Sequence, residues 1–410
     1  MNQGILSVDE ALAQLLSGAQ ALAETEEIST LRATGRVLAK AQVSAINVPP
    51  LDNSSMDGYA VRAAECASGE TRLAVSQRIP AGSVPKPLTV GTAARIFTGA
   101  PIPPGADAVV MQELCAAEGN DAVIRHRPKP GDWIRRVGED IRAGNRILEA
   151  GIKLRPQDVG LAASVGIAAL PVFRRLKVAV FFTGDELVMP GEPLPQGAIY
   201  NSNRFTITAI LEQLGCEISD FGIIPDSLAS TRDALRRAAL ENDLIITSGG
   251  VSVGEEDHVK PAVEAEGRLQ MWKIAIKPGK PLAFGRIGPE AQPGQPGSAA
   301  FIGLPGNPVS AYVTLAILVR PFILRAQGMT QIRPIAFPLR ADFDWARPDS
   351  RREYLRVKLN ASGGLELFPN QSSAVLTSTV WGDGLVDNMP KHAIKRGDMV
   401  TFLPFAGLFR

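Results

Sequence analysis

The chain has 410 residues, with Lys+Arg 43 against Asp+Glu 42 and a formal net charge of +1. A hydrophobic fraction of 45% and a charged fraction of 21% are typical of globular proteins and exclude a wholly disordered chain. A net charge this close to zero gives no support to nucleic acid as a partner, because such binding requires clustered Lys and Arg side chains.

The first predicted element is a helix near the N-terminus. Ser7 and Glu10 have capping-box spacing, and the apolar residues that follow lie on a helical stripe. From Val43 to Leu154 short apolar runs are broken by Pro, Gly and Asp, which predicts strands and turns. We therefore expect an N-terminal region of residues 1–170 with a β-rich lobe at residues 45–140.

Strand and helix patterns alternate in the middle of the chain. The apolar strand runs Val178–Phe182 and Leu244–Thr247 are followed by patterns with helical spacing. This alternation predicts a doubly wound parallel α/β domain at residues 176–328. Short alternating strands return in residues 333–410 and predict a small C-terminal β-barrel-like domain. The predicted fold class is multidomain α/β plus β.

Cysteine and histidine are sparse, and the sequence has no C-x-x-C or H-x-x-x-H pair, so we do not expect a structural zinc site. The cysteines favour a reducing compartment, where each is expected to be a small buried hydrophobe. We see neither a signal peptide nor an uncharged apolar stretch of about 18 residues. The expectation is a soluble, cytoplasmic protein without a membrane partner. The residues concerned are Cys66, Cys115, Cys216, His126, His258 and His392.

Three predicted strands run into loops of unusual composition, Thr183–Glu186, Ser248–Asp257 and Pro305–Pro308. In a parallel α/β sheet, ligands bind at the carboxyl ends of the strands. The second loop contains Gly249 and Gly250, where backbone N–H groups can approach an anion without obstruction by a Cβ atom. The alternative is an ordinary flexible loop, since neither a Walker motif nor a dinucleotide fingerprint is present.

Lys273 and Lys277 flank a short apolar segment that precedes a Pro-Gly turn. On one extended strand this spacing places both ammonium groups on the same face. They can then clamp a phosphate or another oxyanion. The alternative is a pair of solvated lysines, and the apolar Ile274 and Ile276 on the opposite face favour the clamp.

Four acidic residues stand out because they lie in these loops, in the polar stretch Leu51–Arg62, or, for Asp226, just after the predicted strand Ile218–Ile224. Together they could hold Mg²⁺ or the counter-cation of an oxyanion, although sequence separation leaves their convergence open. The alternatives are an Asx-rich turn for the first and helix capping for the last. The four residues are Asp57, Glu186, Asp226 and Asp257.

These motifs together resemble the molybdopterin molybdenumtransferase family, which includes bacterial MoeA proteins and the E domain of gephyrin. They occur in register over essentially the whole chain, with no fused adenylyltransferase module. The motifs are Leu51–Arg62, Phe97–Ala100, Thr183–Leu187, Ser248–Asp257, Lys277–Pro281 and Gly303–Pro308.

The resemblance implies an enzyme that inserts molybdenum from molybdate into adenylylated molybdopterin and releases AMP. It implies Mg²⁺ as cofactor, with Asp226 and Asp257 as expected ligands. It also implies a homodimer whose site combines the α/β domain of one subunit with the N-terminal β region of the other. A contact with the adenylyltransferase of the same pathway is left open.

Site residues follow from the resemblance, position by position. Catalytic roles fall on Asp57, Glu186, Asp226 and Asp257. Substrate binding falls on Thr98, Ser248, Gly249, Gly250, Lys273, Lys277, Pro305, Pro308 and Ser373, with Ser372 as a neighbouring alternative. Both substrates are anions, and a like-charge contact at about 4 Å costs about 4 kcal/mol at the effective dielectric constant of a protein surface. The acidic residues therefore require Mg²⁺ or protons between them and the oxyanions.

Two other functions remain open. Single-domain relatives with a similar α/β core adenylylate molybdopterin with ATP, and gephyrin also serves as a scaffold in receptor clustering. The N-terminal region that carries Asp57 and the C-terminal domain favour insertion, because an isolated adenylyltransferase needs neither. The lack of a long linker disfavours the scaffold.

Overall fold

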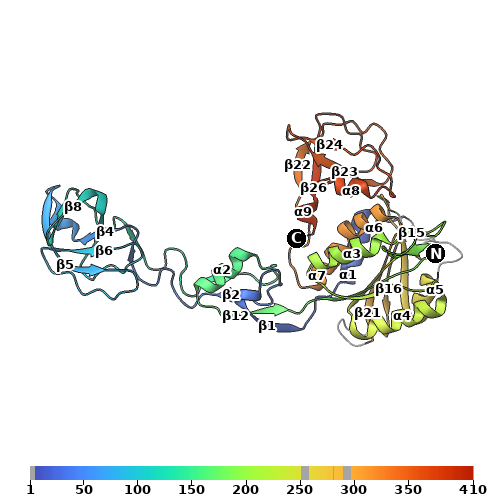
Figure 1. The fold of residues 1–410 in the computed structure, drawn as a ribbon, viewed down its shortest axis with the longest axis horizontal. Helices are drawn as coiled ribbons and strands as arrows, with labels where there is room; N and C mark the ends of the chain where they lie inside the picture. The colour runs from blue at the N-terminus through green and yellow to red at the C-terminus, as the bar shows by residue number, and fades with distance from the viewer. Residues whose placement is uncertain (1–4, 251–257, 280, 290–296, 410) are drawn as a thin grey trace.

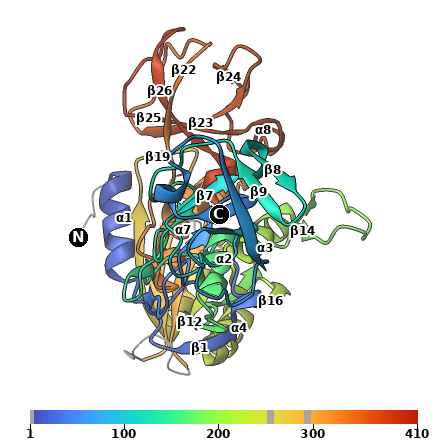
Figure 2. The ribbon, with the colours of Figure 1, turned by 90° about the vertical axis from the view of Figure 1, so that its left-hand side faces the viewer.

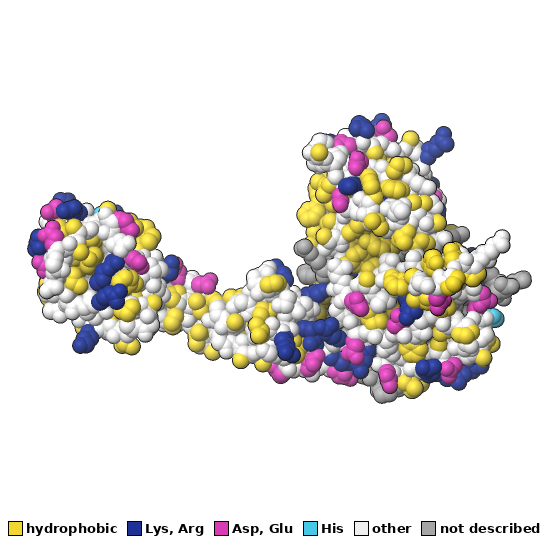
Figure 3. All heavy atoms as spheres, in the orientation of Figure 1, with side chains coloured by type: hydrophobic (Ala, Val, Ile, Leu, Met, Phe, Trp, Pro, Cys, Tyr) yellow, Lys and Arg dark blue, Asp and Glu magenta, His cyan; other side chains and the backbone are white. Residues whose placement is uncertain are grey.

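The computed structural model describes residues 5–250, 258–279, 281–289 and 297–409. It is elongated: a distal lobe and a narrow middle segment lead to an α/β domain, on which a C-terminal domain stands (Figure 1). The narrow middle segment separates two wider ends, as the space-filling view also shows (Figure 3).

The distal lobe is built on one six-stranded sheet, in the order β7-β4-β6-β5-β9-β8. Alternating side chains of β4 bury Tyr59 and Val61 on one face of this sheet and Ala60 on the other. All six strands lie in the stretch that was predicted to be β-rich. Their bounds are β4 (Gly58–Val61), β5 (Thr71–Ile79), β6 (Thr92–Ile96), β7 (Ala108–Met111), β8 (Cys115–Glu118) and β9 (Asp121–Ile124).

The middle segment consists of short antiparallel pairs and one helix. Its core contains Leu38, Leu154 and Leu170. The helix starts at Pro156, since proline is compatible with the first turn. The elements are β1 (Thr25–Ser29) with β12 (Ala169–Phe173), β2 (Gln42–Val43) with β11 (Arg146–Leu148), β3 (Asn53–Ser54) with β10 (Ile134–Arg135), and α2 (Pro156–Ser164).

The α/β domain has a six-stranded sheet in the order β16-β13-β17-β21-β20-β18. The first four strands are parallel, which confirms the doubly wound prediction, but β20 and β18 run antiparallel at one edge. The short connection between β18 and β20 has no crossover helix, and such connections join antiparallel strands. The bounds are β13 (Lys177–Phe182), β16 (Glu217–Ile223), β17 (Leu244–Ser248), β18 (Gly267–Lys273), β20 (Pro281–Ile287) and β21 (Ala299–Leu304).

Helices cover both faces of this sheet. On one face α4 (Leu228–Glu241) and α5 (Val259–Glu266) pack over Phe181 and Phe301. The other face carries α1, and its Val8 and Leu15 belong to the α/β core although the helix lies in the N-terminal region. Its predicted capping box is confirmed. The remaining helices on this face are α3 (Ser202–Gln213), α6 (Pro308–Thr314) and α7 (Arg320–Ala326), and α1 spans Val8–Ser17.

Among the described residues, one helical stretch, Pro308–Ala326, is long and apolar enough to cross a membrane, and 89% of it is buried inside the protein. It comprises α6, the π-helical turn Leu315–Val319 and α7. Its side chains belong to the same core as the sheet. We therefore assign it as a core helix of the α/β domain.

The C-terminal domain is the small β domain that was predicted. Its sheet has the order β19-β23-β25-β26-β22, and β19 is a strand contributed by the α/β region. The strands and helices are β19 (Ile276–Lys277), β22 (Phe337–Arg340), β23 (Arg352–Leu359), β24 (Leu365–Leu367), β25 (Gly384–Asn388), β26 (Met399–Pro404), α8 (Thr377–Trp381) and α9 (Phe405–Leu408).

The cysteine prediction is confirmed for Cys66 and Cys216, which are buried, and is wrong for Cys115, which is partly exposed. Burial raises the pKa of Cys66 and Cys115 to about 11 and that of Cys216 to about 12. These thiols are therefore protonated at neutral pH and are poor metal ligands.

A buried ion pair ties the middle segment to the α/β domain. Arg174 donates to both carboxylate oxygens of Asp243 at 2.7 and 2.8 Å, and the Asp243 side chain is 7% exposed. Asp243→Ala leaves this guanidinium without its main partner, and we expect the free energy of unfolding to fall by about 3–5 kcal/mol. The exposed pair Arg146–Glu149 is the control, since Glu149→Ala should cost about 1 kcal/mol or less. Urea unfolding of both variants checks this, and equal losses would contradict it.

Candidate active site

A cavity of about 1160 Å³ opens where β13, β17 and β21 end. These strands are adjacent and parallel, so their carboxyl ends meet at one edge of the sheet. The three loops singled out in the sequence all contribute to its wall, and the C-terminal domain closes one side. Figure 2 shows that domain directly above the α/β domain.

Two glycines shape the floor of this cavity. Gly249 has φ +98° and Gly250 φ +62°, a region that favours glycine. A Cβ atom on Gly249 would lie 2.7 Å from the carbonyl oxygen of Thr183. The Gly249 N–H donates to the carbonyl of Leu304 at 3.3 Å and is therefore already paired. Anion binding by amides of this loop stays a prediction.

Gly249→Ala and Gly191→Ala form a matched pair, because both glycines have φ +98° but Gly191 has open space where its Cβ would lie. Gly191→Ala should cost about 1–2 kcal/mol from the backbone conformation alone. Gly249→Ala should cost about 1–3 kcal/mol more, since the new methyl group meets a backbone carbonyl that cannot rotate away. Melting temperatures check the order, and equal stability of the two variants would show that the close packing is unimportant.

A polar residue that the sequence analysis missed holds the cavity loops together. Asn203 donates to the Ser248 hydroxyl at 2.9 Å and to the Gly306 carbonyl at 2.7 Å. Ser248 in turn donates to the carbonyl of Pro305 at 2.9 Å. Asn203 lies in the first turn of α3. This helix follows directly after the short strands β14 (Leu187–Val188) and β15 (Ile199–Tyr200). The sequence signal that could have identified it is the Asn-x-Asn pattern of Asn201 and Asn203 at the start of this helix.

The two predicted lysines do not lie on one strand, and that expectation is wrong. Lys273 ends β18 and pairs with Pro281 in the α/β sheet, whereas Lys277 lies in β19 and pairs with Glu353 in the C-terminal sheet. The chain changes sheets between them. Among the described residues that line the cavity, Lys277 is present and Lys273 is absent.

The C-terminal domain adds a polar wall formed by Ser372, Ser373 and Arg351. The Ser373 carbonyl accepts from the N–H of Val309 at 3.0 Å, which joins this wall to α6. Arg356 is buried, donates to the Ser372 carbonyl at 3.2 Å, and has its pKa lowered to about 10 by burial. Both serines line the cavity, so the choice between them stays open. Arg351 was missed, although a basic pair just before a strand marks it.

The acidic candidates lie in different places. Glu186 lines the cavity. Asp226 follows β16 at the same edge of the sheet and is absent from the described lining, and Asp257 lies outside the described residues. Asp57 is in the distal lobe, where its carboxylate accepts from the N–H and the hydroxyl of Thr98, both at 2.8 Å. These hydrogen bonds hold the pKa of Asp57 below its usual value.

Within the described residues, no group of three His, Cys, Asp or Glu side chains is arranged to hold a metal ion. Of the described residues that line the cavity, Glu186 is the one carboxylate, and Lys277 and Arg351 line the same cavity. These residues alone do not fit a protein-only cage for Mg²⁺, which takes oxygen ligands in octahedral geometry.

Comparison with known sequences identifies the protein family of this chain. The molybdopterin molybdenumtransferase of Haemophilus influenzae is 40% identical over 408 residues, which cover 98% of this chain and 99% of that protein. The chain belongs to the molybdopterin molybdenumtransferase family. The resemblance drawn from the six motifs is therefore confirmed, as is the prediction of an enzyme.

Further comparisons agree with membership of this family. The molybdopterin molybdenumtransferase 2 of Mycobacterium tuberculosis is 41% identical over 378 residues, 89% of this chain and 90% of that protein. The family models MoeA N-terminal region (domain I and II), probable molybdopterin binding domain, and MoeA C-terminal region (domain IV) match residues 6–166, 179–325 and 338–405.

Solved structures share the whole architecture of the family. One molybdopterin biosynthesis MoeA protein from Pyrococcus horikoshii has a TM-score of 0.79 and 31% identity, covering 98% of this chain and 99% of that chain. A second structure from the same organism has a TM-score of 0.83 and 27% identity, covering 98% and 100%. The multidomain α/β plus β fold class is confirmed.

Proposed function

We propose that this chain transfers molybdenum from molybdate to adenylylated molybdopterin in the cavity at the end of β13, β17 and β21, and releases AMP. The observation that carries the proposal is the 40% identity to a molybdopterin molybdenumtransferase over 99% of that protein's length. Metal transfer to molybdopterin follows from this family membership. The adenylylated form of the pterin and the release of AMP are the finer part of the proposal.

Two cationic side chains in the cavity wall suit an anionic substrate, and each also contacts a carboxylate that is not part of the described lining. Lys277 and Arg351 both line it, and their side chains are 34% and 32% exposed. A partly buried cation binds phosphate or another oxyanion through charge-assisted hydrogen bonds, which are stronger than neutral ones. The proline rings of Pro305 and Pro308 contribute an apolar part of the wall against which a pterin ring can pack.

We further propose that the complete site is shared between two subunits. Asp57 precedes β4 and Thr98 follows β6 in the distal lobe, which lies at one end of the molecule, and the α/β domain with the cavity lies at the other (Figure 1). The two sets cannot meet within one chain of this shape. Large apolar side chains are exposed in the stretches that connect the distal lobe to the middle segment, which suits coverage by a second copy. They are Val43, Ile46, Leu51, Trp133 and Val137.

Mg²⁺ stays part of the proposal, with Asp226 and Asp257 as its expected ligands and Glu186 nearby in the cavity wall. When bound, the ion would neutralise charge on the pyrophosphate. Because the described residues do not form a complete set of ligands, we derive no step through the ion. A cytoplasmic location and a contact with the adenylyltransferase of the same pathway are likewise proposed.

One assay separates this function from the alternatives. Purified protein is incubated with adenylylated molybdopterin, molybdate and Mg²⁺, and in parallel with molybdopterin and ATP. Release of AMP that depends on molybdate supports insertion. Consumption of ATP would instead indicate an adenylyltransferase, and inactivity in both mixtures would favour a scaffold.

A further inference from the structure

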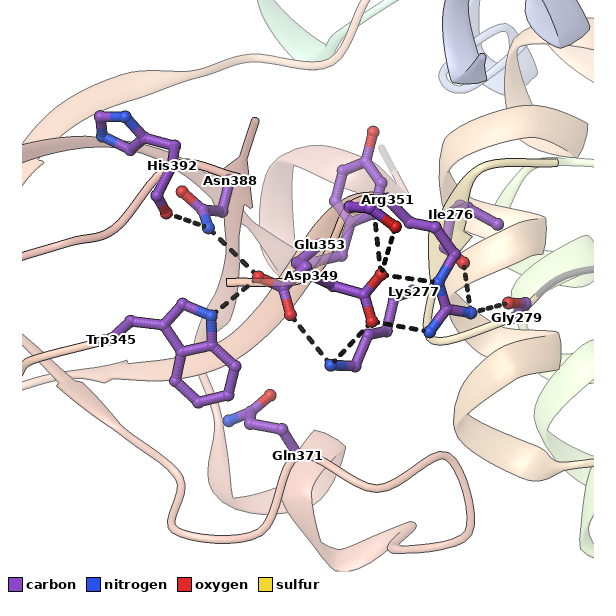
Figure 4. Close-up of polar contacts among 12 residues, drawn as sticks. Ile276, Lys277, Gly279, Trp345, Asp349, Arg351, Glu353, Gln371, Asn388 and His392 are labelled. Carbon is purple, nitrogen blue, oxygen red and sulfur yellow. Dashed lines mark hydrogen bonds and ion pairs between the residues drawn. The ribbon is translucent and has the colours of Figure 1, made fainter. Parts of the chain in front are cut away.

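A carboxylate of the C-terminal domain contacts the lysine of the cavity. Glu353 lies on β23, and its side chain is 0% exposed. One of its oxygens, Oε1, accepts from Lys277 Nζ at 3.1 Å. The other, Oε2, accepts from the indole N–H of Trp345 at 2.7 Å and from the amide of Asn388 at 3.3 Å (Figure 4). Both oxygens therefore have fixed partners.

A second carboxylate lies close to the same ammonium group but has another main partner. Asp349 Oδ2 is 3.4 Å from Lys277 Nζ. The guanidinium of Arg351 donates to both oxygens of Asp349, from Nε at 3.0 Å and from Nη2 at 2.9 Å. These hydrogen bonds hold the pKa of Asp349 well below its usual range. Asp349 thus serves mainly Arg351, and Glu353 makes the shorter contact with Lys277.

The C-terminal domain therefore surrounds the end of the Lys277 side chain. The strand β19 runs parallel to β23 with Lys277 opposite Glu353, and the Trp345 ring centroid is 5.9 Å from Nζ. The exposed part of the lysine faces the cavity. The position of this ammonium group is set from outside the α/β domain that otherwise forms the site.

Stability alone does not require a carboxylate at this position. A buried ion pair is about as stable as well-packed apolar residues of similar volume, because desolvation of the charges offsets their attraction. An aliphatic side chain would also leave the Trp345 indole without an acceptor, but an uncharged Gln would not. What a carboxylate adds here is a fixed acceptor for the Lys277 ammonium.

We propose that Glu353 is a positioning residue that holds the Lys277 ammonium in the orientation needed to bind the anionic substrate. That Lys277 contacts the substrate rests on the proposed function. That Glu353 orients Lys277 does not. Glu353 itself touches the lysine and its own domain, so it acts on the substrate through Lys277.

The variant Glu353→Gln separates two possible roles of Glu353, because positioning of Lys277 and simple charge compensation predict opposite changes in anion affinity. If Glu353 were only a counter-charge, its removal would raise the positive potential of the cavity and tighten the binding of an anion. If Glu353 positions Lys277, the amide cannot replace it, because an NH₂ group facing an ammonium is a donor against a donor. The lysine then moves towards Asp349, and binding weakens.

The binding experiment titrates adenylylated molybdopterin into wild-type protein and folded variants. Glu353→Gln should weaken binding about fivefold or more, but by less than about twofold in a Lys277→Ala background, because the two residues act as one unit. Glu353→Asp keeps the charge with a shorter reach and should fall between wild type and Glu353→Gln. Asp387→Asn is the matched control: it removes a carboxylate that pairs with Arg352 on the same sheet, away from the cavity, and should leave binding unchanged.

Tighter or unchanged binding in folded Glu353→Gln would overturn the proposal, as would an equal loss in the Lys277→Ala background. If Glu353→Gln does not fold, Glu353→Asp carries the test, and wild-type binding by that variant would overturn the proposal. These binding outcomes test the role of Glu353 only if the wild-type protein binds the pterin.

A second readout does not depend on the substrate. Acetic anhydride acetylates Lys277 and the exposed Lys86 of the distal lobe, and mass spectrometry gives the ratio of the two rates. The ratio should rise by about threefold in Glu353→Gln and less in Glu353→Asp, because the buried carboxylate then no longer holds the ammonium, and the reactive neutral amine forms more readily. An unchanged ratio would overturn the positioning role. If wild type binds no pterin but the acetylation ratio still rises in Glu353→Gln, the proposed function is refuted and the role of Glu353 stays intact.

Discussion

Lys277→Ala is expected to weaken binding of adenylylated molybdopterin by about 1.5–3 kcal/mol, which is about 10- to 150-fold. The reason is the loss of a partly buried ammonium group that lines the cavity and faces an anionic substrate. The variant also leaves the fully buried Glu353 without its cation, so some loss of stability accompanies the loss of affinity. Titration of the pterin at matched ionic strength measures the effect.

Another lysine provides the control for this prediction. Lys358→Ala removes a cation that lies on β23 beside the Trp381 ring. It should change the affinity by less than about threefold, as expected of a charge outside the site. Equal affinities of Lys277→Ala and wild type would show that the cavity lysine does not bind the substrate.

Mixing two variants that are impaired at low substrate concentration is expected to restore about one quarter of the wild-type activity if sites are shared in a twofold dimer. Asp57→Ala has an intact cavity and a defective distal lobe, and Lys277→Ala has the reverse. Random exchange makes half of the dimers mixed, and each mixed dimer holds one site with both parts intact. Activity is followed as AMP release after mixing.

The double variant Asp57→Ala/Lys277→Ala is the control for this experiment. Mixed with either single variant, it yields no intact site and should restore no activity. Subunit exchange is verified by native mass spectrometry with one isotopically labelled partner. If exchange is complete and no activity returns, the distal lobe does not serve the cavity of another subunit.

The parts of the site that the sequence predicted are those fixed by local pattern. The apolar runs of β13, β17 and β21 identify buried strands, and the parallel arrangement brings their ends to one edge. Thr183, Ser248 and Pro305 consequently meet at one cavity although they are far apart in the chain. The capping box of Ser7 and Glu10 was predicted from an equally local pattern.

The parts that could not be predicted depend on contacts between distant segments. The change of sheet between Lys273 and Lys277 is decided by pairing with β23, which the residues of the segment itself do not specify. In the sequence Glu353 is an ordinary residue of a short strand. Its contact with Lys277 depends on the pairing of β19 with β23. The packing of α1 on the α/β core likewise depends on apolar partners far along the chain.

The distal lobe shows the same limit on a larger scale. The hydrogen bonds between Asp57 and Thr98 make one polar cluster from two motifs that the sequence placed in one site with the cavity. The structure puts that cluster at the far end of an elongated molecule (Figure 1). The proposed sharing of the site between subunits, which the family resemblance implies, would reconcile the two, whereas local sequence patterns alone contain no information on how two chains associate.

The most direct test of the central claim compares molybdenum gained with AMP released. Wild-type protein is supplied with adenylylated molybdopterin and molybdate, AMP is quantified by chromatography, and molybdenum in the desalted pterin product is measured by mass spectrometry. The account predicts equal molar amounts, and much smaller amounts of both with Lys277→Ala at a substrate concentration that saturates wild type only partly. Release of AMP without molybdenum in the product, or at the same rate without molybdate, would contradict it.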